Sequence, residues 1–431
     1  MKKTLYLMRH GQTLFNVQKV DQGASDAPLT RLGVAQARAA GNHLAQIGAA
    51  PDHVFCSPYE RTCDTAETVT SCLTADGTPL PYERVWGLRE FSFGSYEGKD
   101  SYLNPSLPFG DKFVQFGGDA QQDVADRMVA TLTELMRRPD VQVALAVSHG
   151  AAVANFCRAI AEWSPVKYHP GIKNCSIFTV EFDEETGHFS CVDLFEPDVP
   201  ADSVPDATAI DFSLMHGAGD AALDTPDGPA VDPAAPKTTW LVRHAETLFN
   251  AQNKVQGWCD SPLTERGIVQ AHVCGCTLAA LGINPDHAFC STSFRASTTL
   301  EILLSEIGKD ALPYLRLKGL REAGFGSFEG KDQCLQPSML DPEADTYYVP
   351  YGGEARADIA DRMYRTLKAI ADRPDIHEAL VVGSRGSATS FFYRPEVVRE
   401  AELKSGANCI IYHYEYADGT FICKEIIVPE D

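Results

Sequence analysis

Leu7-Met-Arg9-His10-Gly-Gln-Thr-Leu-Phe-Asn16 begins at the end of an apolar run and continues through an arginine and a histidine. Leu241-Val-Arg243-His244-Ala-Glu-Thr-Leu-Phe-Asn250 repeats this pattern downstream. His244 follows His10 by 234 residues, and Arg295 follows Arg61 by the same distance. In a chain of 431 residues, so constant a period predicts two tandem domains of similar fold.

A segment of unusual composition separates the two copies. Residues 197–236 are rich in Asp, Pro, Ala and Gly and contain no Lys or Arg. This composition predicts an extended, solvated, acidic linker, of which 210–215 could dock on a domain. We therefore expect an N-terminal domain at 1–196, a linker at 197–236 and a C-terminal domain at 237–431.

Strand and helix patterns alternate within each copy. In the first, apolar runs at 4–8, 53–56 and 143–147 predict strands, and helical periodicity follows Thr30 and recurs over 124–135. Ser57-Pro-Tyr-Glu60 has the pattern of a capping box, which would place Arg61 in the first turn of a helix. The expected fold class is α/β: two tandem three-layer α/β/α domains, each a mostly parallel sheet with helices on both faces.

The composition restricts the partners. The net charge of −22 argues against nucleic acid or an anionic membrane, so a small anionic substrate would need a local cluster of arginines. Thirteen cysteines without a Cys-x-x-Cys pair or zinc-finger spacing favour a reduced, cytoplasmic protein over a disulfide framework or a zinc site. No apolar stretch is long enough for a transmembrane helix.

His10, Arg61 and His149 would meet at the carboxyl ends of parallel strands, where such sheets bind ligands. A neutral imidazole can attack phosphorus while guanidinium groups hold the phosphoryl oxygens, so an Arg-His pair suits phosphoryl transfer. The alternative for a lone histidine is a loop hydrogen bond.

Two further segments recur in both copies. Arg61, at a helix N-terminus, could bind phosphate, although a surface ion pair is the common role of such an arginine. Gln22-Gly23 permits close approach of the backbone to a ligand, but it could equally be an ordinary turn.

Glu90 and Glu97 are both candidates for a general acid. They lie in Leu88-Arg-Glu-Phe-Ser-Phe-Gly-Ser-Tyr-Glu-Gly98, where aromatic neighbours could raise a carboxyl pKa. The other glutamate would then be a solvated loop residue. Spacing does not choose between them.

Together the motifs Arg-His-Gly, Ser-Pro-x-x-Arg, Leu-x-Glu and Ser-His-Gly resemble the histidine phosphatase superfamily, the phosphoglycerate mutase-like fold. The resemblance implies that His10 is the phosphorylated nucleophile and Glu90 the proton donor. It implies a phosphate pocket, without metal or cofactor, formed by Arg9, Arg61 and His149, with Asn16, Gln22, Gly23 and Gly150 beside it.

The second copy departs from this pattern at one decisive place. Matching Ser-His-Gly to Ser384-Arg-Gly386 puts Arg385 at the position of the second histidine. An arginine keeps the charge but differs in reach, so phosphate binding would survive better than turnover. The other expected counterparts are Arg243, His244, Asn250, Gln256, Gly257, Arg295 and Glu322.

The expected activity is therefore a metal-independent phosphomonoesterase of the first domain, acting on a small phosphorylated substrate. Phosphoglycerate mutase-type transfer is the enzymatic alternative, although Gly117-Gly-Asp119 favours the phosphatase branch. In a third interpretation, the second domain is a phospho-ligand sensor or an internal-dimer module, and homodimers are also compatible with the sequence.

Overall fold

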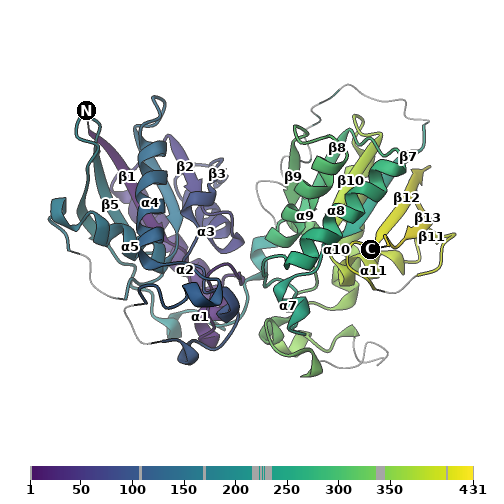
Figure 1. The fold of residues 1–431 in the computed structure, drawn as a ribbon, viewed down its shortest axis with the longest axis horizontal. Coiled ribbons are helices and arrows are strands. Elements are labelled where there is room, and N and C mark those ends of the chain that lie inside the picture. The colour runs from purple at the N-terminus through teal and green to yellow at the C-terminus, as the bar shows by residue number, and fades with distance from the viewer. Residues whose placement is uncertain are drawn as a thin grey trace. The chain divides into compact units, whose positions relative to one another are not determined.

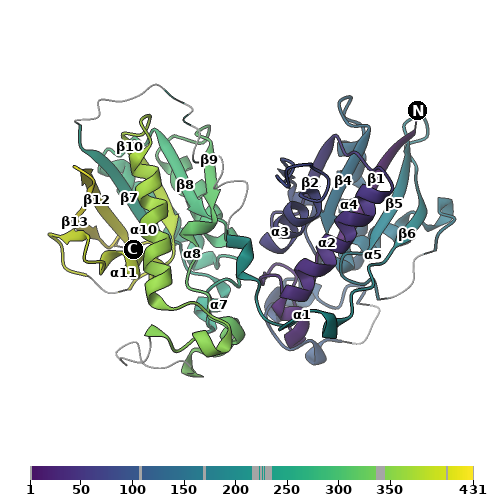
Figure 2. The same ribbon diagram turned by 180° about the vertical axis from the view of Figure 1, so that it is seen from behind.

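Each half of the chain folds around its own β-sheet (Figures 1 and 2). The computed structural model describes residues 2–105, 109–167, 171–215, 223, 226, 228, 235–335, 345–403 and 406–430. The chain divides into two compact units, Met1–Asp211 and Phe212–Asp431. Within the described ranges, no helix is long and apolar enough to cross a membrane, and no cluster of three or more His, Cys, Asp or Glu could hold a metal ion.

The first sheet is mixed, with strand order β3-β2-β4-β1-β5-β6. The four strands from β3 to β1 are parallel, and β5 and β6 form an antiparallel hairpin against β1. The strands are β1 (Lys2–Arg9), β2 (His53–Cys56), β3 (Glu83–Arg84), β4 (Val143–Ser148), β5 (Ile177–Asp183) and β6 (Phe189–Phe195).

Helices cover both faces of this sheet, as the alternation along β1 requires. Leu7 packs in a core with α4 and α5, whereas the next residue, Met8, packs in a second core with α2 and α3. Thr30 caps α2 by accepting the Gly33 N–H, as its place before an apolar period predicted. The helices are α1 (Leu14–Gln18), α2 (Arg31–Gln46), α3 (Glu60–Thr70), α4 (Gln121–Met136) and α5 (Gly150–Ala159).

The second unit repeats the architecture, with strand order β11-β13-β12-β7-β10-β8-β9. Its strands are β7 (Lys237–Arg243), β8 (His287–Ser291), β9 (Tyr314–Leu317), β10 (Glu378–Gly383), β11 (Val397–Arg399), β12 (Ile411–Ala417) and β13 (Thr420–Ile427). Its helices are α7 (Leu248–Ala251), α8 (Glu265–Ala280), α9 (Phe294–Glu306), α10 (Arg356–Asp372) and α11 (Arg385–Phe392). The predicted class of two α/β/α domains is thus confirmed, with an antiparallel hairpin added to each sheet.

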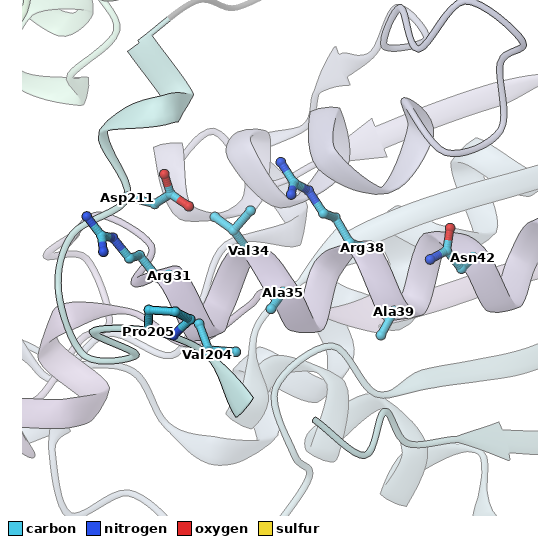
Figure 3. Close-up of a pocket in the computed structure, with 9 residues that line it drawn as sticks. All are labelled: Arg31, Val34, Ala35, Arg38, Ala39, Asn42, Val204, Pro205 and Asp211. Carbon is cyan, nitrogen blue, oxygen red and sulfur yellow. The ribbon is translucent and has the colours of Figure 1, made fainter. Parts of the chain in front are cut away.

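We expected the acidic segment after β6 to be an extended, solvated linker. Part of this segment instead packs on the first domain. Arg31 and Leu32 donate their N–H groups to Ala209 and Ala207, and Ile210 is buried. This part of the segment therefore packs along α2. Figure 3 shows Val204, Pro205 and Asp211 of the same segment beside that helix, with which they line a pocket. Phe212, one residue beyond Asp211, belongs to the second unit, where it packs against Trp258.

Candidate active site

The carboxyl ends of β1 and β4 bring the two histidines of the first unit together. The strands are parallel neighbours in which Arg9 is level with Ser148, and the His10 N–H donates to the Ser148 carbonyl at 3.0 Å. Each histidine immediately follows its strand, so the rings of His10 and His149 lie edge to face with centroids 5.3 Å apart.

His10 is held in one tautomer. Its Nδ1 lies 2.7 Å from the Gly11 carbonyl, which can only accept, so Nδ1 carries the proton and Nε2 keeps its lone pair. Burial lowers the pKa of His10 well below 6.5, and the charges of Arg61 and Arg9 lower it further. The ring is therefore a neutral base whose Nε2 carries the lone pair that a nucleophile requires.

Arg61 is fully buried and makes several hydrogen bonds, so it is not a surface residue. It forms an ion pair with buried Asp26 at 2.8 Å and donates to the carbonyls of Ser25 and Gly23. Its Nε–H donates to Nδ1 of His149 at 3.0 Å. The alternative of a surface ion pair is thus wrong, because the loop that carries Gly23 is shaped to hold the guanidinium inside the molecule.

His149 is fixed through both ring nitrogens. Because its Nδ1 accepts from Arg61, its Nε2 carries the proton and donates to the Ser57 hydroxyl at 2.7 Å. Burial is the main cause that lowers the pKa of His149, so this ring is also neutral. Ser57 orients His149, and the predicted capping box is wrong: α3 begins at Glu60, after Tyr59, without a side-chain cap.

The two candidate glutamates have different environments. Glu90 accepts from the N–H groups of Phe91, Ala151 and Ala152, which places its carboxyl group at the N-terminus of α5, directly after His149. Glu97 accepts five hydrogen bonds, which come from 23–25 and from Phe93. Glu97 therefore stabilises the loop that holds Arg61, whereas Glu90 contacts the helix that begins directly after His149.

Arg9 presents a buried donor that the described part of the chain leaves unsatisfied. One of its terminal nitrogens donates to the Ile172 carbonyl, but Nε has no partner. A Cβ at Gly150 would lie 3.2 Å from this Nε, so a side chain at that position would crowd the guanidinium. A buried donor of this kind is suited to an anionic ligand.

Asn16 and Gln22 brace the surrounding loops. Asn16 accepts from the Thr13 N–H in a capping box and from Asn174, whose amide also donates to the His10 carbonyl. Gln22 accepts from the Thr13 hydroxyl at 2.7 Å. Both side chains thus act on the loop around His10 rather than on its ring.

Three residues that sequence reasoning missed support the site. Asp26 pairs with Arg61, Thr65 accepts the Gly11 N–H, and Asn174 holds the His10 carbonyl. Each has a counterpart in the repeat: Asp260, Thr299 and Asn408. The recurring Asp-x-Pro-Leu-Thr and Asn-Cys pairs were the available signals.

The second unit keeps most of this geometry. His244 donates from Nδ1 to the Ala245 carbonyl at 2.8 Å, and burial lowers its pKa well below 6.5. Arg295 pairs with Asp260 at 2.9 Å and donates to Gly257, and Glu322 accepts from the first-turn amides of α11. Asn250 and Gln256 repeat the bonds to Thr247.

The register of β10 corrects the assignment of Arg385. Gly383 is level with Arg243 and accepts the His244 N–H, as Ser148 does in the first unit. Ser384, not Arg385, therefore occupies the position of the second histidine, and Arg385 is the counterpart of Gly150. The glutamate contacts agree, because Glu322 receives Gly386 and Ser387 where Glu90 receives Ala151 and Ala152.

With Ser384 in place of a histidine, the Arg295 guanidinium lacks the imidazole partner that Arg61 has in His149. Arg295 Nε, which has lost the imidazole acceptor, is buried without a partner in the described ranges, and only a 3.4 Å bond links Arg295 to the Ser384 hydroxyl. Arg385 is exposed and its guanidinium lies against Gly406, whose carbonyl accepts from Arg243. Burial, and then the charge of Arg385, lower the pKa of Arg243 to about 10.

The aromatic residues near Glu90 pack mainly on one another. Phe91, Phe93, Phe109 and Phe113 form successive edge-to-face and tilted contacts, and Phe113 is fully buried. In the second unit, Tyr347, Tyr348 and Tyr351 pack in the same way on Phe328. These ring contacts indicate that the aromatic side chains of both segments serve hydrophobic packing.

Comparisons with known proteins find relatives for both halves of the chain. The family model for the histidine phosphatase superfamily (branch 1) matches residues 5–194 and 239–428. A 2,3-bisphosphoglycerate-dependent phosphoglycerate mutase of Brucella ovis is 30% identical over 204 residues, which are 44% of this chain and 98% of that protein. A Bacillus anthracis phosphoglycerate mutase structure is 22% identical, with a TM-score of 0.40 over 45% of this chain and 94% of that one. A mycobacterial glucosyl-3-phosphoglycerate phosphatase structure is 20% identical, with a TM-score of 0.35 over 45% and 98%.

Proposed function

The chain belongs to the histidine phosphatase superfamily, and we propose that its first domain hydrolyses phosphomonoesters through a phosphohistidine at His10. The observation that carries the proposal is the neutral His10 ring, whose Nε2 keeps its lone pair and which lies against His149 and its partner Arg61. The thirteen cysteines, which include no Cys-x-x-Cys pair, favour a reducing compartment, and we propose the cytoplasm.

The reaction would proceed in two displacements. His10 Nε2 forms a bond to phosphorus while the ester P–O bond breaks, and Glu90 gives a proton to the departing oxygen. Water then attacks phosphorus, the P–N bond breaks, and Glu90 takes the proton from water. Arg9 would hold the phosphoryl oxygens through its unsatisfied Nε–H, and Arg61 would fix His149 against them.

The second domain, by the same chemistry, would bind a phosphate group without efficient turnover. It keeps His244 and adds the charge of Arg385 beside Arg243, but Ser384 does not reproduce the two hydrogen bonds of His149. Ground-state attraction of an anion depends mainly on charge, whereas catalysis depends on oriented contacts in the transition state. A sensor role, or a role in pairing with the first domain, would follow from binding alone.

Phosphoryl transfer to a second hydroxyl is the other candidate activity. The curated relative from Brucella is named as a phosphoglycerate mutase, and the same phosphohistidine serves both reactions. A mutase would return the phosphoryl group to phosphoglycerate faster than to water. The ratio of isomerised to hydrolysed 3-phosphoglycerate therefore distinguishes the two activities.

The direct test compares two matched variants of the full chain. His10→Ala should abolish the acid-labile phosphoenzyme and lower turnover of p-nitrophenyl phosphate by several orders of magnitude. His244→Ala removes the equivalent ring from the other domain and should leave most of the activity. Near-normal turnover in a folded His10→Ala chain would refute the assignment of the nucleophile.

A further inference from the structure

Two thiols face each other behind the first active site. Cys56 is the last residue of β2 and Cys63 lies in the first turns of α3. Their sulfur atoms are 3.5 Å apart, and both side chains are buried. A disulfide would need the sulfur atoms to approach to about 2.0 Å, which is a short movement for two side chains already in contact.

A guanidinium group adjoins this pair. Arg84 of β3 is level with Cys56 in the sheet, and its Nε–H donates to the Cys63 sulfur at 3.2 Å. Burial opposes a charged thiolate, but the hydrogen bond with Cys56 and the charge of Arg84 outweigh it and lower the pKa of Cys63. The Arg84 side chain, which also pairs with Glu60 at 2.9 Å, is 21% exposed, so solvent reaches part of the residue that contacts Cys63.

The chain between the two cysteines carries the contacts of His149. Ser57 accepts from His149 Nε2, Arg61 donates to Nδ1, and the Tyr59 ring lies edge-on to the imidazole at 5.7 Å. A crosslink would close this eight-residue segment, 56–63, into a ring. Any shift of the first turn of α3 would therefore move groups that orient His149.

We propose that Cys56 and Cys63 form a reversible disulfide on exposure to a peroxide, and that this bond lowers turnover at His10. The Cys63 thiolate attacks one oxygen of hydrogen peroxide, giving a sulfenic acid and hydroxide. The Cys56 sulfur then attacks the Cys63 sulfur and loses its proton, and the sulfenic oxygen leaves as water. Two thiols are thus oxidised, one peroxide is reduced to two waters, and a dithiol reductant restores the pair.

The second domain provides a natural control for this inference. Cys290 of β8 is level with Arg316 of β9, as Cys56 is with Arg84. Ser297 stands at the position of Cys63, so the partner thiol is missing there. A Cys63→Ser variant of the first domain therefore copies an arrangement that the same fold already accommodates.

Peptide mapping of the full chain tests the disulfide itself. Iodoacetamide first blocks the exposed thiols of Cys276 and Cys334, and hydrogen peroxide is then added. Trypsin cleaves after Arg61, between the two cysteines, so the oxidised pair appears as two peptides joined by a disulfide. The linked species should form in the wild-type chain, disappear with dithiothreitol and be absent from Cys63→Ser.

The activity arm rests on the proposed phosphatase function, whereas the peptide arm does not. Oxidation should lower p-nitrophenyl phosphate turnover at least tenfold, with recovery in dithiothreitol. Cys63→Ser should keep its activity in peroxide, and Cys157→Ser, which removes a buried cysteine of α5, should remain sensitive. No linked peptide, or equal inactivation of Cys63→Ser, overturns the proposal. An inactive reduced chain that still forms the linked peptide counts against the phosphatase assignment alone.

Discussion

Placing an imidazole at residue 384 tests the proposal that Ser384 limits turnover in the second domain. The double variant Ser384→His, Arg385→Gly recreates the His149-Gly150 sequence in the register that β10 defines. Arg295 Nε, now buried without an acceptor in the described ranges, would face a ring nitrogen, and the Ser291 hydroxyl corresponds to that of Ser57.

The expected gain follows from the contacts that His149 makes. In the first domain this ring accepts from Arg61 at 3.0 Å and donates to Ser57 at 2.7 Å. A buried donor left unsatisfied costs about 1–3 kcal/mol, which the new acceptor at Arg295 would recover. One oriented contact in a transition state is worth roughly 100-fold or more in turnover, so we expect an increase of about 100-fold.

The assay uses the full chain with His10→Ala, so that any turnover of p-nitrophenyl phosphate arises in the second domain. Arg385→His alone is the matched control, because it completes the Ser-His-Gly letters but puts the ring at the position of Gly150. It should leave turnover unchanged. Higher turnover in Arg385→His, without a gain in the double variant, would show that residue 385 and not residue 384 is the counterpart of His149. If the folded double variant is as slow as the parent, the missing imidazole is not what limits this site.

The remaining predictions concern the glutamates and the response to acid. Glu90→Gln should slow hydrolysis of alkyl phosphates by about 100-fold and of p-nitrophenyl phosphate much less, because the latter leaving group hardly needs a proton; Glu97→Gln should instead lower the urea midpoint, since Glu97 accepts five hydrogen bonds. An equal loss for both esters in Glu90→Gln would reverse the assignment. Burial holds the pKa of His10, His149 and His244 well below 6.5, so the unfolded chain binds protons that the native chain does not. The free energy of unfolding therefore decreases as the pH falls below 6.5, by up to about 1.4 kcal/mol per pH unit for each ring, and above pH 6.5 these rings add no pH dependence to it. His149→Gln should make the urea midpoint less sensitive to pH between 6.5 and 5.

The sequence pattern correctly predicted those elements whose formation depends on neighbouring residues alone. The strand at 53–56 and the Thr30 cap follow from alternation and from a hydroxyl before a helix, and both are present. The predicted capping box at Ser57 is absent, because α3 begins only at Glu60. The Ser57 hydroxyl instead accepts a hydrogen bond from His149, which lies far along the chain. Asp26 could not be assigned, because its role depends on the fold of the loop that brings it to Arg61.

The error at Arg385 has a different cause. Ser-x-Gly occurs in both copies, so the letters align at Ser384 even though the strands pair one residue earlier, at Gly383. A sequence comparison rewards matching letters, whereas a sheet is aligned by hydrogen bonds between strands, and a slip of one residue exchanges the roles of neighbouring side chains. The register therefore had to come from the structure.

The same contacts explain why the second copy resembles an active enzyme. Arg295 closes a buried ion pair with Asp260, and Glu329 accepts the amides of 257–259, so losing either would leave a buried group unsatisfied. These residues would be retained for stability in a domain without turnover. At the position of the second histidine, Ser384 leaves the single donor Arg295 Nε without a partner in the described ranges, but the buried ion pair of Arg295 with Asp260 is kept. In a duplicated domain of this kind, motif residues that also stabilise the structure identify the fold but not the activity. Residues such as His149 and its counterpart Ser384 are the ones that distinguish the chemistry of the two domains.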